Sequence, residues 1–246
     1  MHIDILTLFP EMFSPVTQSM LGRAADRGIL DIRLTNIRDY SKDKHNKADD
    51  YPFGGGCGMV MMAQPVFDAM EAIGARDKKA IYMSPRGKVL DQAKIEELSK
   101  EEELIILCGH YEGVDERIID YWNMEEISIG DYILTGGELA AMVLIDAVAR
   151  FVPDVLGSGE CATEESIYSG LLEYPQYTKP REYNGLCVPE VLFGGNHKLI
   201  HLWNYEKALE LTKSRRPDLF EKYLKSEPPL TKDEKKILQK IMESED

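Results

Sequence analysis

Short apolar runs alternate with amphipathic stretches along the first two thirds of the chain. The apolar runs are rich in β-branched or large side chains and predict strands at residues 3–9, 30–37, 80–83, 104–108 and 127–134. Short buried strands that alternate with helices are typical of a parallel sheet covered on both faces. The pattern therefore predicts an α/β fold.

Five stretches among these strands predict helices. The first begins at Ser14 and Pro15, a capping hydroxyl followed by proline in the first turn, and ends near Gly28. The others cover residues 64–73, 91–98, 115–121 and 139–149. Asp146 is the only charged residue of the last stretch, so we expect that helix to be buried nearly all round.

The pattern changes near residue 153. Residues 153–189 combine glycines, prolines and tyrosines with acidic side chains, and a structureless stretch of this length is usually functional or a linker. Helical patterns return at 198–212, 219–224 and 232–242. The sequence therefore predicts an α/β domain to about residue 160, a linker, and a small helical domain.

The overall charge is acidic. The 246 residues include 43 Asp and Glu against 29 Lys and Arg, a net charge of −14. Such a chain repels polyanions at long range, so a nucleic-acid partner needs a local basic patch. Residues 205–225 hold more cations than carboxylates, and we expect phosphate contacts there, with an ordinary solvated helix surface as the alternative. The cations are Lys207, Lys213, Arg215, Arg216, Lys222 and Lys225.

Composition also disfavours several classes of protein. No run approaches the roughly 18 apolar residues of a membrane helix, and the start of the chain has no basic leader, so we expect a cytoplasmic protein without membrane contact. The four cysteines include no C-x-x-C pair, which indicates reduced, mostly structural thiols. His197 and His201 lie four residues apart, but no third ligand is indicated, so no metal site is predicted.

Three glycine-containing segments follow predicted strands, at residues 82–87, 108–117 and 128–139. Open α/β sheets bind ligands at this edge. The dinucleotide fingerprint is incomplete, because Met59 stands where a third glycine is needed, and there is no P-loop. Small residues, bare backbone and few cations favour a neutral or cationic ligand over a polyphosphate. Tight turns without a ligand are the alternative.

The same segments closely resemble the TrmD family, the bacterial tRNA (guanine-N1)-methyltransferases of the knotted SPOUT superfamily. The resemblance covers residues 3 to about 219 in one order of motifs. The motifs are PFGGGCGM at 52–59, YMSPRG at 82–87, CGHYEGVDER at 108–117, SIGDYILTGGEL at 128–139, GLLEYP at 170–175 and GNH at 195–197.

The resemblance implies transfer of the methyl group of S-adenosylmethionine to N-1 of the guanine immediately 3′ of the tRNA anticodon. It implies an obligate homodimer with active sites at the interface, and a magnesium-dependent reaction. It also implies a SPOUT-type parallel sheet with a deep trefoil knot. The expected domains are a knotted S-adenosylmethionine-binding domain at 1–160, a linker carrying the candidate base at 161–188, and a helical tRNA-binding domain at 189–246.

Three loops of the knot are expected to wrap the donor in a bent shape. The donor-binding residues implied by the resemblance are Tyr82, Ser84, Pro85, Gly109, Tyr111, Glu112, Gly113, Ser128, Ile129, Gly130, Asp131, Tyr132, Ile133, Leu134, Gly136 and Gly137.

Methylation of guanine N-1 requires a base for its proton and a positive group near O-6. Arg150 aligns with the family's arginine for the second task, and a helix C-terminal cation paired with Asp146 is the alternative. Glu165 stands where the family typically has aspartate. The longer side chain matters, since a misplacement of about 1 Å can cost on the order of 100-fold in rate. A SPOUT paralogue acting on another RNA and a non-catalytic RNA- or donor-binding module are the alternative functions.

Overall fold

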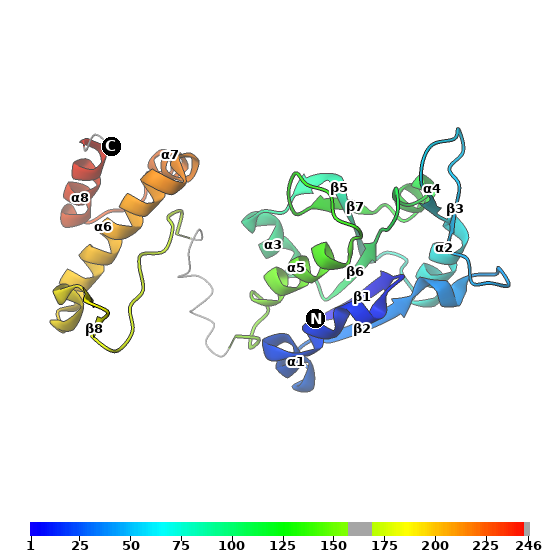
Figure 1. The fold of residues 1–246 in the computed structure, drawn as a ribbon, viewed down its shortest axis with the longest axis horizontal. Coiled ribbons are helices and arrows are strands. Elements are labelled where there is room, and N and C mark those ends of the chain that lie inside the picture. The colour runs from blue at the N-terminus through cyan, green and yellow to red at the C-terminus, as the bar shows by residue number, and fades with distance from the viewer. Residues whose placement is uncertain (157–168, 244–246) are drawn as a thin grey trace. The chain divides into compact units, whose positions relative to one another are not determined.

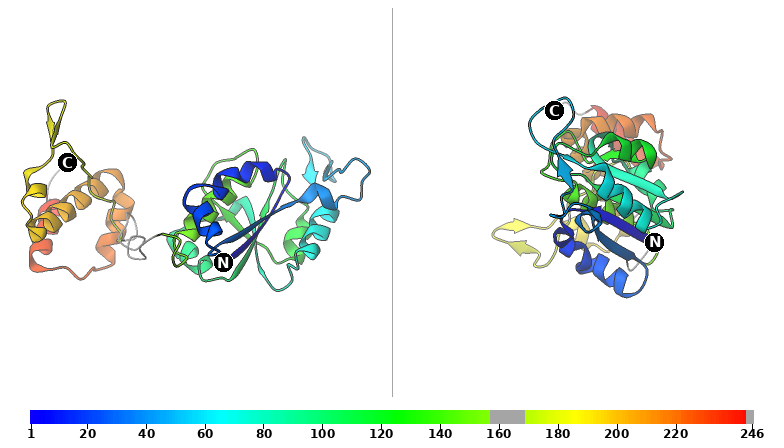
Figure 2. Two further views of the ribbon diagram at one scale, coloured as in Figure 1. Left: turned by 90° about the horizontal axis from the view of Figure 1, so that it is seen from below. Right: turned by 90° about the vertical axis from the view of Figure 1, so that its right-hand side faces the viewer.

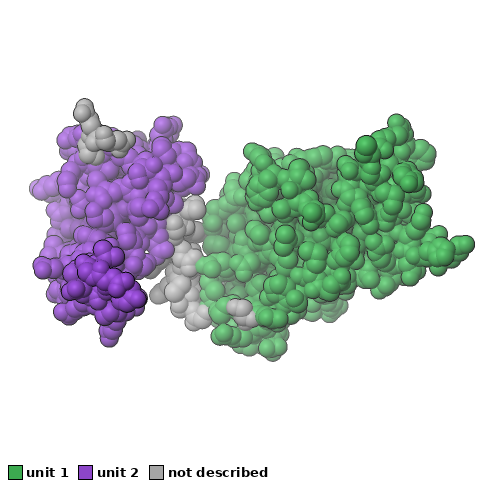
Figure 3. All heavy atoms as spheres, viewed as in Figure 1, with its two compact units in different colours: residues 1–159 green, residues 160–246 purple. Residues whose placement is uncertain are grey.

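The computed structural model describes residues 1–156 and 169–243. The chain divides into two compact units, Met1–Gly159 and Glu160–Asp246, which Figure 3 shows in green and purple. Among the described residues, two clusters of buried apolar side chains lie in unit 1 and one lies in unit 2. None of the helices in the described part of the chain is long and apolar enough to cross a membrane.

A five-stranded parallel sheet forms the centre of unit 1 (Figure 1). Its strand order is β2-β1-β6-β5-β7, with every neighbouring pair parallel. The strands are β1 (His2–Thr7), β2 (Asp31–Asn36), β5 (Lys79–Val89), β6 (Glu103–Cys108) and β7 (Glu125–Ser128). The predicted parallel α/β fold is therefore confirmed.

Helices cover both faces of this sheet, as Figure 2 shows from below. On one face pack η1 (Pro10–Thr17), α1 (Ser19–Asp26), α3 (Gln92–Leu98) and α5 (Glu138–Ala149). On the other face pack η2 (Ile37–Tyr40), α2 (Ala63–Ala72) and α4 (Glu116–Tyr121). Successive side chains of a strand point to opposite faces of the sheet, so both layers of helices receive apolar side chains from the same strand. In β6, Ile106 packs with the first group of helices and Ile105 with the second.

A short antiparallel pair lies outside the main sheet. It joins β3 (Asp49–Asp50) to β4 (Val60–Met61). Figure 1 shows the loops on either side of β3 extending from the body of unit 1.

Unit 2 is mainly helical. It contains α6 (His197–Arg215), α7 (Pro217–Lys225), α8 (Lys232–Glu243), a short 3-10 helix η3 (Glu190–Phe193), and a hairpin of β8 (Glu182–Tyr183) and β9 (Leu186–Cys187). Leu209, Phe220 and Ile241 pack together at its centre. Leu171, from the stretch expected to be a linker, is 5% exposed and packs in the same cluster.

Most predicted helices and strands are confirmed to within a few residues, and four differ. The strand expected at 80–83 continues to Val89. The helix expected from residue 14 is a 3-10 helix followed by α1, since Pro15 has no N–H to donate within a regular helix. The strand expected at 127–134 ends at Ser128. Helix α5 is not buried all round, because Leu139 and Val143 are 48% and 49% exposed.

Candidate functional site

The three strand-end segments meet around one pocket at the carboxyl ends of β5, β6 and β7. The pocket has a volume of about 400 Å³. Every predicted donor-binding residue lines it except Asp131. The lining residues that the sequence analysis missed are Met83, Arg86, His110, Val114, Glu116, Ile119, Ile127, Thr135 and Ala140. Nearly all of these lie within or beside the three segments, so proximity in sequence was the available signal.

Close backbone approach holds two of these segments together. The N–H of Gly137 donates to the carbonyl oxygen of Gly109 at 2.8 Å, and His110 and Gly136 form an antiparallel bridge. A Cβ on Gly137 would lie 2.9 Å from the backbone nitrogen of Gly109. Because backbone atoms cannot move aside easily, the contact requires glycine at position 137.

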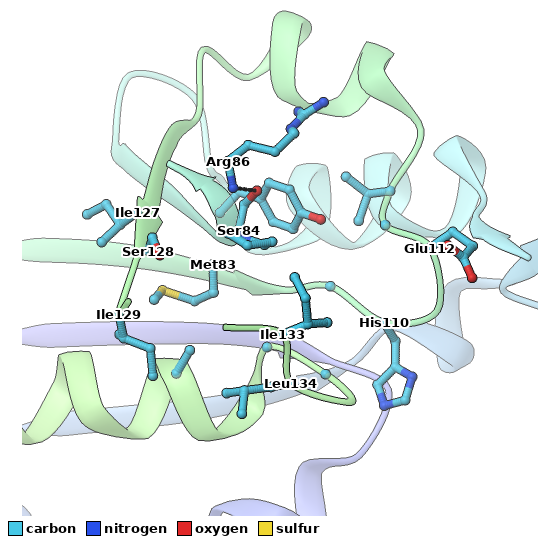
Figure 4. Close-up of a pocket in the computed structure, with 18 of the residues that line it drawn as sticks. Met83, Ser84, Arg86, His110, Glu112, Ile127, Ser128, Ile129, Ile133 and Leu134 are labelled. Atoms are coloured by element: carbon cyan, nitrogen blue, oxygen red, sulfur yellow. Dashed lines mark hydrogen bonds between the residues drawn. The ribbon is translucent and has the colours of Figure 1, made fainter. Parts of the chain in front are cut away.

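The third segment is a bulge within β5. Met83 and Lys88 both pair with Ile127, so the residues between them leave the regular ladder. The Ser84 hydroxyl accepts a hydrogen bond from the Arg86 N–H at 3.2 Å, which Figure 4 shows as a dashed line. The bulge thereby directs Ser84 and Pro85 to the pocket, although the sequence analysis expected the strand to end at residue 83.

Tyr111 lies at the pocket in an unusual backbone conformation. Its φ of 58° is in the left-handed region, which bulky residues rarely adopt. Its hydroxyl accepts a hydrogen bond from Arg38 at 3.2 Å. Backbone strain of this kind concentrates at ligand-binding and catalytic sites.

The charge around the pocket is neutral to acidic. Arg86 donates to both Glu116 and Glu126 at 3.0–3.2 Å, and these carboxylates raise the pKa of the guanidinium above its ordinary value. Glu112 is exposed and has no ion pair within the described residues. Two carboxylates on the lining against one arginine favour a cationic or neutral ligand over a phosphate.

The pocket also has an apolar region. Figure 4 shows Met83, Ile133 and Leu134 gathered in the same part of it, with Glu112 at its edge. Tyr82 lines the pocket and is largely buried, and burial raises the pKa of its hydroxyl. A flat, uncharged ring system would be well accommodated here.

Of the two predicted catalytic residues, only Arg150 is described, and it is not among the residues that line the pocket. Arg150 is half-buried at the C-terminal end of α5, 13 residues after Gly137. At a rise of about 1.5 Å per residue, the two backbone positions are roughly 20 Å apart along the helix. Glu165 lies outside the described residues. Their predicted roles stay predictions.

The predicted basic patch of unit 2 is partly neutralised by neighbouring groups. Lys207, Arg216 and Lys225 pair with carboxylates two to four residues away. Lys213 donates to the carbonyl oxygen of Ile241. Arg215 and Lys222 are exposed and have no acidic partner within the described residues. These two cations are therefore the most available for an anionic partner.

The described residues contain no group of three or more His, Cys, Asp or Glu side chains arranged to hold a metal ion. His201 instead bonds Glu234, with 2.9 Å between Nε2 and Oε1. Cys57, Cys108 and Cys187 are free thiols, and burial raises the pKa of Cys108. Cys161 falls in the part that the structure leaves undescribed.

A parallel α/β sheet with tightly packed strand-end loops around one pocket defines a ligand-binding protein of the open-sheet class. Comparison with known proteins narrows this class. A family model described as tRNA (Guanine-1)-methyltransferase TrmD matches residues 1–222. The chain belongs to this family.

Relatives named "tRNA (guanine-N(1)-)-methyltransferase" resemble the chain over almost its full length. The protein from Ruminiclostridium cellulolyticum is 59% identical over 226 residues, covering 90% of this chain and 97% of the relative. That of Clostridium botulinum strain Hall is 54% identical over 239 residues, covering 97% of each chain. That of Clostridium acetobutylicum is 52% identical over 239 residues, covering 97% of this chain and 96% of the relative.

Proposed function

We propose that this protein transfers the methyl group of S-adenosylmethionine to N-1 of the guanine immediately 3′ of the tRNA anticodon. The observation that carries the proposal is the family match over residues 1–222. The reaction belongs to tRNA processing, and we place it in the cytoplasm. S-adenosylmethionine supplies an activated methyl group on a positively charged sulfur.

The pocket residues fit such a donor. Gly109, Gly130 and Gly137 have no Cβ, and Tyr82, Tyr132 or neighbouring backbone atoms occupy the space that a Cβ would need, so these glycines let the loops pack closely around the pocket. The apolar region around Ile133 and Leu134 would take the adenine ring, while the acidic side would face the sulfonium charge. The predicted residues other than Asp131 are assigned to donor binding on this basis.

Two further residues are assigned to the guanine. The Glu165 carboxylate would accept the N-1 proton, which makes the nitrogen nucleophilic. The Arg150 guanidinium would stabilise the negative charge that develops at O-6. Both roles rest on the resemblance of their sequence positions to those of the family.

The distance between Arg150 and the pocket of its own chain supports a homodimer. Leu139, Val143, Asp146 and Arg150 follow the spacing of one helical face, and the first two are half-exposed apolar side chains. If two copies pack α5 against α5 in opposite directions, the end of one helix lies beside the start of the other. Arg150 of one subunit would then serve the pocket of its partner, as the two-fold symmetry of such dimers allows.

The magnesium dependence that the resemblance implies has one suitable side chain at the pocket. Glu112 is exposed, and no cation of the described residues neutralises it. Magnesium is usually bound by one or two carboxylates together with water and substrate. Because Glu112 also lies on the acidic side that would face the sulfonium, it would contact the ion through water, and the RNA and further water would supply the other ligands.

The test is methyl transfer to unmodified tRNA, with mass spectrometry of the anticodon loop. The proposal expects one methyl group on the guanine immediately 3′ of the anticodon. Methylation of another nucleotide would favour a paralogue with a different RNA target. Donor binding in calorimetry without any transfer would favour a non-catalytic module.

A further inference from the structure

The loop between β3 and β4 carries two aromatic side chains that pack against little of the protein. Phe53 is 103% exposed and Tyr51 is 79% exposed. No other large apolar side chain of the described residues is as exposed as Phe53. An isolated exposed aromatic is common, but two within three residues on a projecting loop form a small surface suited to a ligand.

This loop is attached to the rim of the donor pocket. The Glu112 N–H donates to the carbonyl oxygen of Met59 at 3.0 Å, and the Met61 N–H donates to that of Gly113 at 2.9 Å. A Cβ on Gly58 would lie 2.5 Å from Oε1 of Glu112. The C-terminal part of the loop is therefore held against the pocket lining, and the loop as a whole starts from the rim of the pocket.

The tip of the loop is open backbone. Gly54 and Gly55 have φ values of 87° and 78°, which favour glycine, and a Cβ on either would meet nothing within 4 Å. Glycine is thus required there by conformation and not by crowding. The loop leaves Phe53 standing clear of the protein, with room for a flat group on its face.

Cations lie in the segment that precedes the loop. Residues 41–47 contain three lysines and a histidine against one aspartate, opposite in sign to the whole chain. Lys42 pairs with Asp68 at 2.7 Å. Lys44 is exposed and has no acidic partner in the described residues. Lys47 is exposed as well but interacts with the nearby Asp43 carboxylate without forming a close ion pair, so Lys44 is the more available of the two to phosphates.

We propose that Tyr51 and Phe53 form a stacking platform for unpaired bases of the tRNA, while Lys44 and Lys47 contact the adjoining phosphates. Proteins recognise single-stranded RNA through aromatic side chains on which bases stack, combined with nearby positive charge. The anticodon loop supplies such bases beside the guanine to be methylated. This inference rests on the proposed function for the identity of the RNA.

The test compares the affinities of Phe53→Leu and Phe53→Tyr for an unmodified, fluorescently labelled tRNA by anisotropy. Loss of one stacked base weakens binding by about 5- to 100-fold. The tRNA affinity of Phe53→Leu should therefore be lower than that of the wild type by a factor in this range, whereas the affinity of Phe53→Tyr should stay within about twofold of the wild type. Donor affinity in calorimetry should not change. Tyr121→Leu, at a 56% exposed position on α4, is the matched control and should bind tRNA normally.

A second measurement detects stacking directly. Phe53→Trp should add a fluorescence signal that tRNA quenches, whereas the fluorescence of the wild type should change less. Circular dichroism checks that each variant is folded, which is expected because Phe53 is fully exposed.

Equal tRNA affinities of the wild type and Phe53→Leu overturn the inference. So does a Phe53→Leu variant that loses self-association in sedimentation, because the aromatics would then belong to an interface between copies. A wild type that binds tRNA but transfers no methyl group contradicts the proposed function alone, since the platform is measured by binding.

Discussion

The Thr7 hydroxyl donates a hydrogen bond to Oε1 of Glu138 at 2.8 Å, between residues 131 positions apart in the sequence. Both side chains are buried, and Oε2 of Glu138 has no hydrogen-bond partner within the described residues. The contact ties the end of β1 to the first residue of α5. It therefore fixes the position of Gly136 and Gly137, which precede that helix and close the pocket.

We expect Gly109→Val and Gly130→Val each to abolish measurable donor binding while the helical content is retained. A Cβ at position 109 would lie 2.7 Å from the ring of Tyr82, and Gly130 has a φ of 146° that valine rarely adopts. Calorimetry with S-adenosylmethionine measures the effect. Gly194→Val, where a Cβ would meet nothing closer than 3.8 Å, is the control. Unchanged affinity in both folded pocket variants would contradict the assignment of the pocket.

Arg150→Ala should lower turnover without changing donor affinity, because Arg150 does not line the pocket of its own chain. The sharper experiment mixes Arg150→Ala with Gly109→Val. If each pocket receives Arg150 from the partner subunit, random exchange between equal amounts should restore about a quarter of wild-type activity, from heterodimers with one intact site. No recovery after verified exchange would show that Arg150 acts within its own subunit, and a fully active monomer in light scattering would refute the dimer.

Glu165→Gln should leave donor and tRNA affinity nearly unchanged and lower turnover by about 10²- to 10⁴-fold, the usual cost of losing a general base. Higher pH should recover part of this loss, because guanine N-1 then loses its proton without help. Glu165→Asp restores the residue typical of the family. A loop adapted to glutamate should lose activity on this change, whereas a compromised enzyme should gain it. Wild-type rates in both variants would exclude Glu165 as the base.

Binding of tRNA should depend strongly on salt although the chain is acidic. Replacing both Arg215 and Lys222 by alanine should reduce the magnitude of the slope of log affinity against log salt by about two. Each lost phosphate contact accounts for roughly one unit of this slope. Arg216→Ala is the matched control, since that guanidinium already bonds Asp218. We expect a smaller change of the slope for Arg216→Ala. A slope that stays constant in the double variant would locate the main RNA contacts elsewhere.

Glu234 makes the stability of unit 2 dependent on pH. Hydrogen bonds from the Thr231 hydroxyl and from His201 hold the pKa of Glu234 below its usual value of 4.5. A carboxyl whose pKa is lower in the folded state stabilises that state above its unfolded pKa, and the contribution disappears as the pH falls through the folded value. Glu234→Gln should therefore lower the free energy of unfolding by about 1 kcal/mol at pH 7, and by less below about pH 4. Urea titrations at pH 7 and below pH 4 measure the free energy of unfolding of Glu234→Gln and of the parent protein. A Trp122→Phe background leaves Trp203, in α6, as the single tryptophan, so that its fluorescence reports on unit 2.

The strands and helices could be predicted because their signals are local. The apolar run at β6 and the almost uncharged sequence of α5 each identify an element without reference to the rest of the chain. The exposure of Leu139 and Val143 could not be predicted, since an apolar sequence does not distinguish a buried face from one left for a partner.

The pocket was partly predictable. Glycine loops at strand ends indicated the right edge of the sheet, but the close approach of Gly137 to Gly109 depends on long-range packing. The bulge that brings Ser84 to the pocket depends on pairing of β5 with β7, which no local pattern encodes. The ion pairs of Arg86 with Glu116 and Glu126 join residues 30 and 40 positions away and were missed for the same reason.

The position of β1 in the sheet has a consequence for synthesis of the protein. His2 of β1 pairs with Glu103 of β6, so this edge of β1 has no partner until about a hundred further residues have been translated. At roughly 5–20 residues per second, that interval is about 5–20 seconds. Ile3, Ile5 and Leu6 of β1 emerge from the ribosome before β6 and are fully buried in the finished sheet. The nascent chain therefore exposes these three apolar side chains of β1 for seconds, until β6 is available to pair with this edge of the strand.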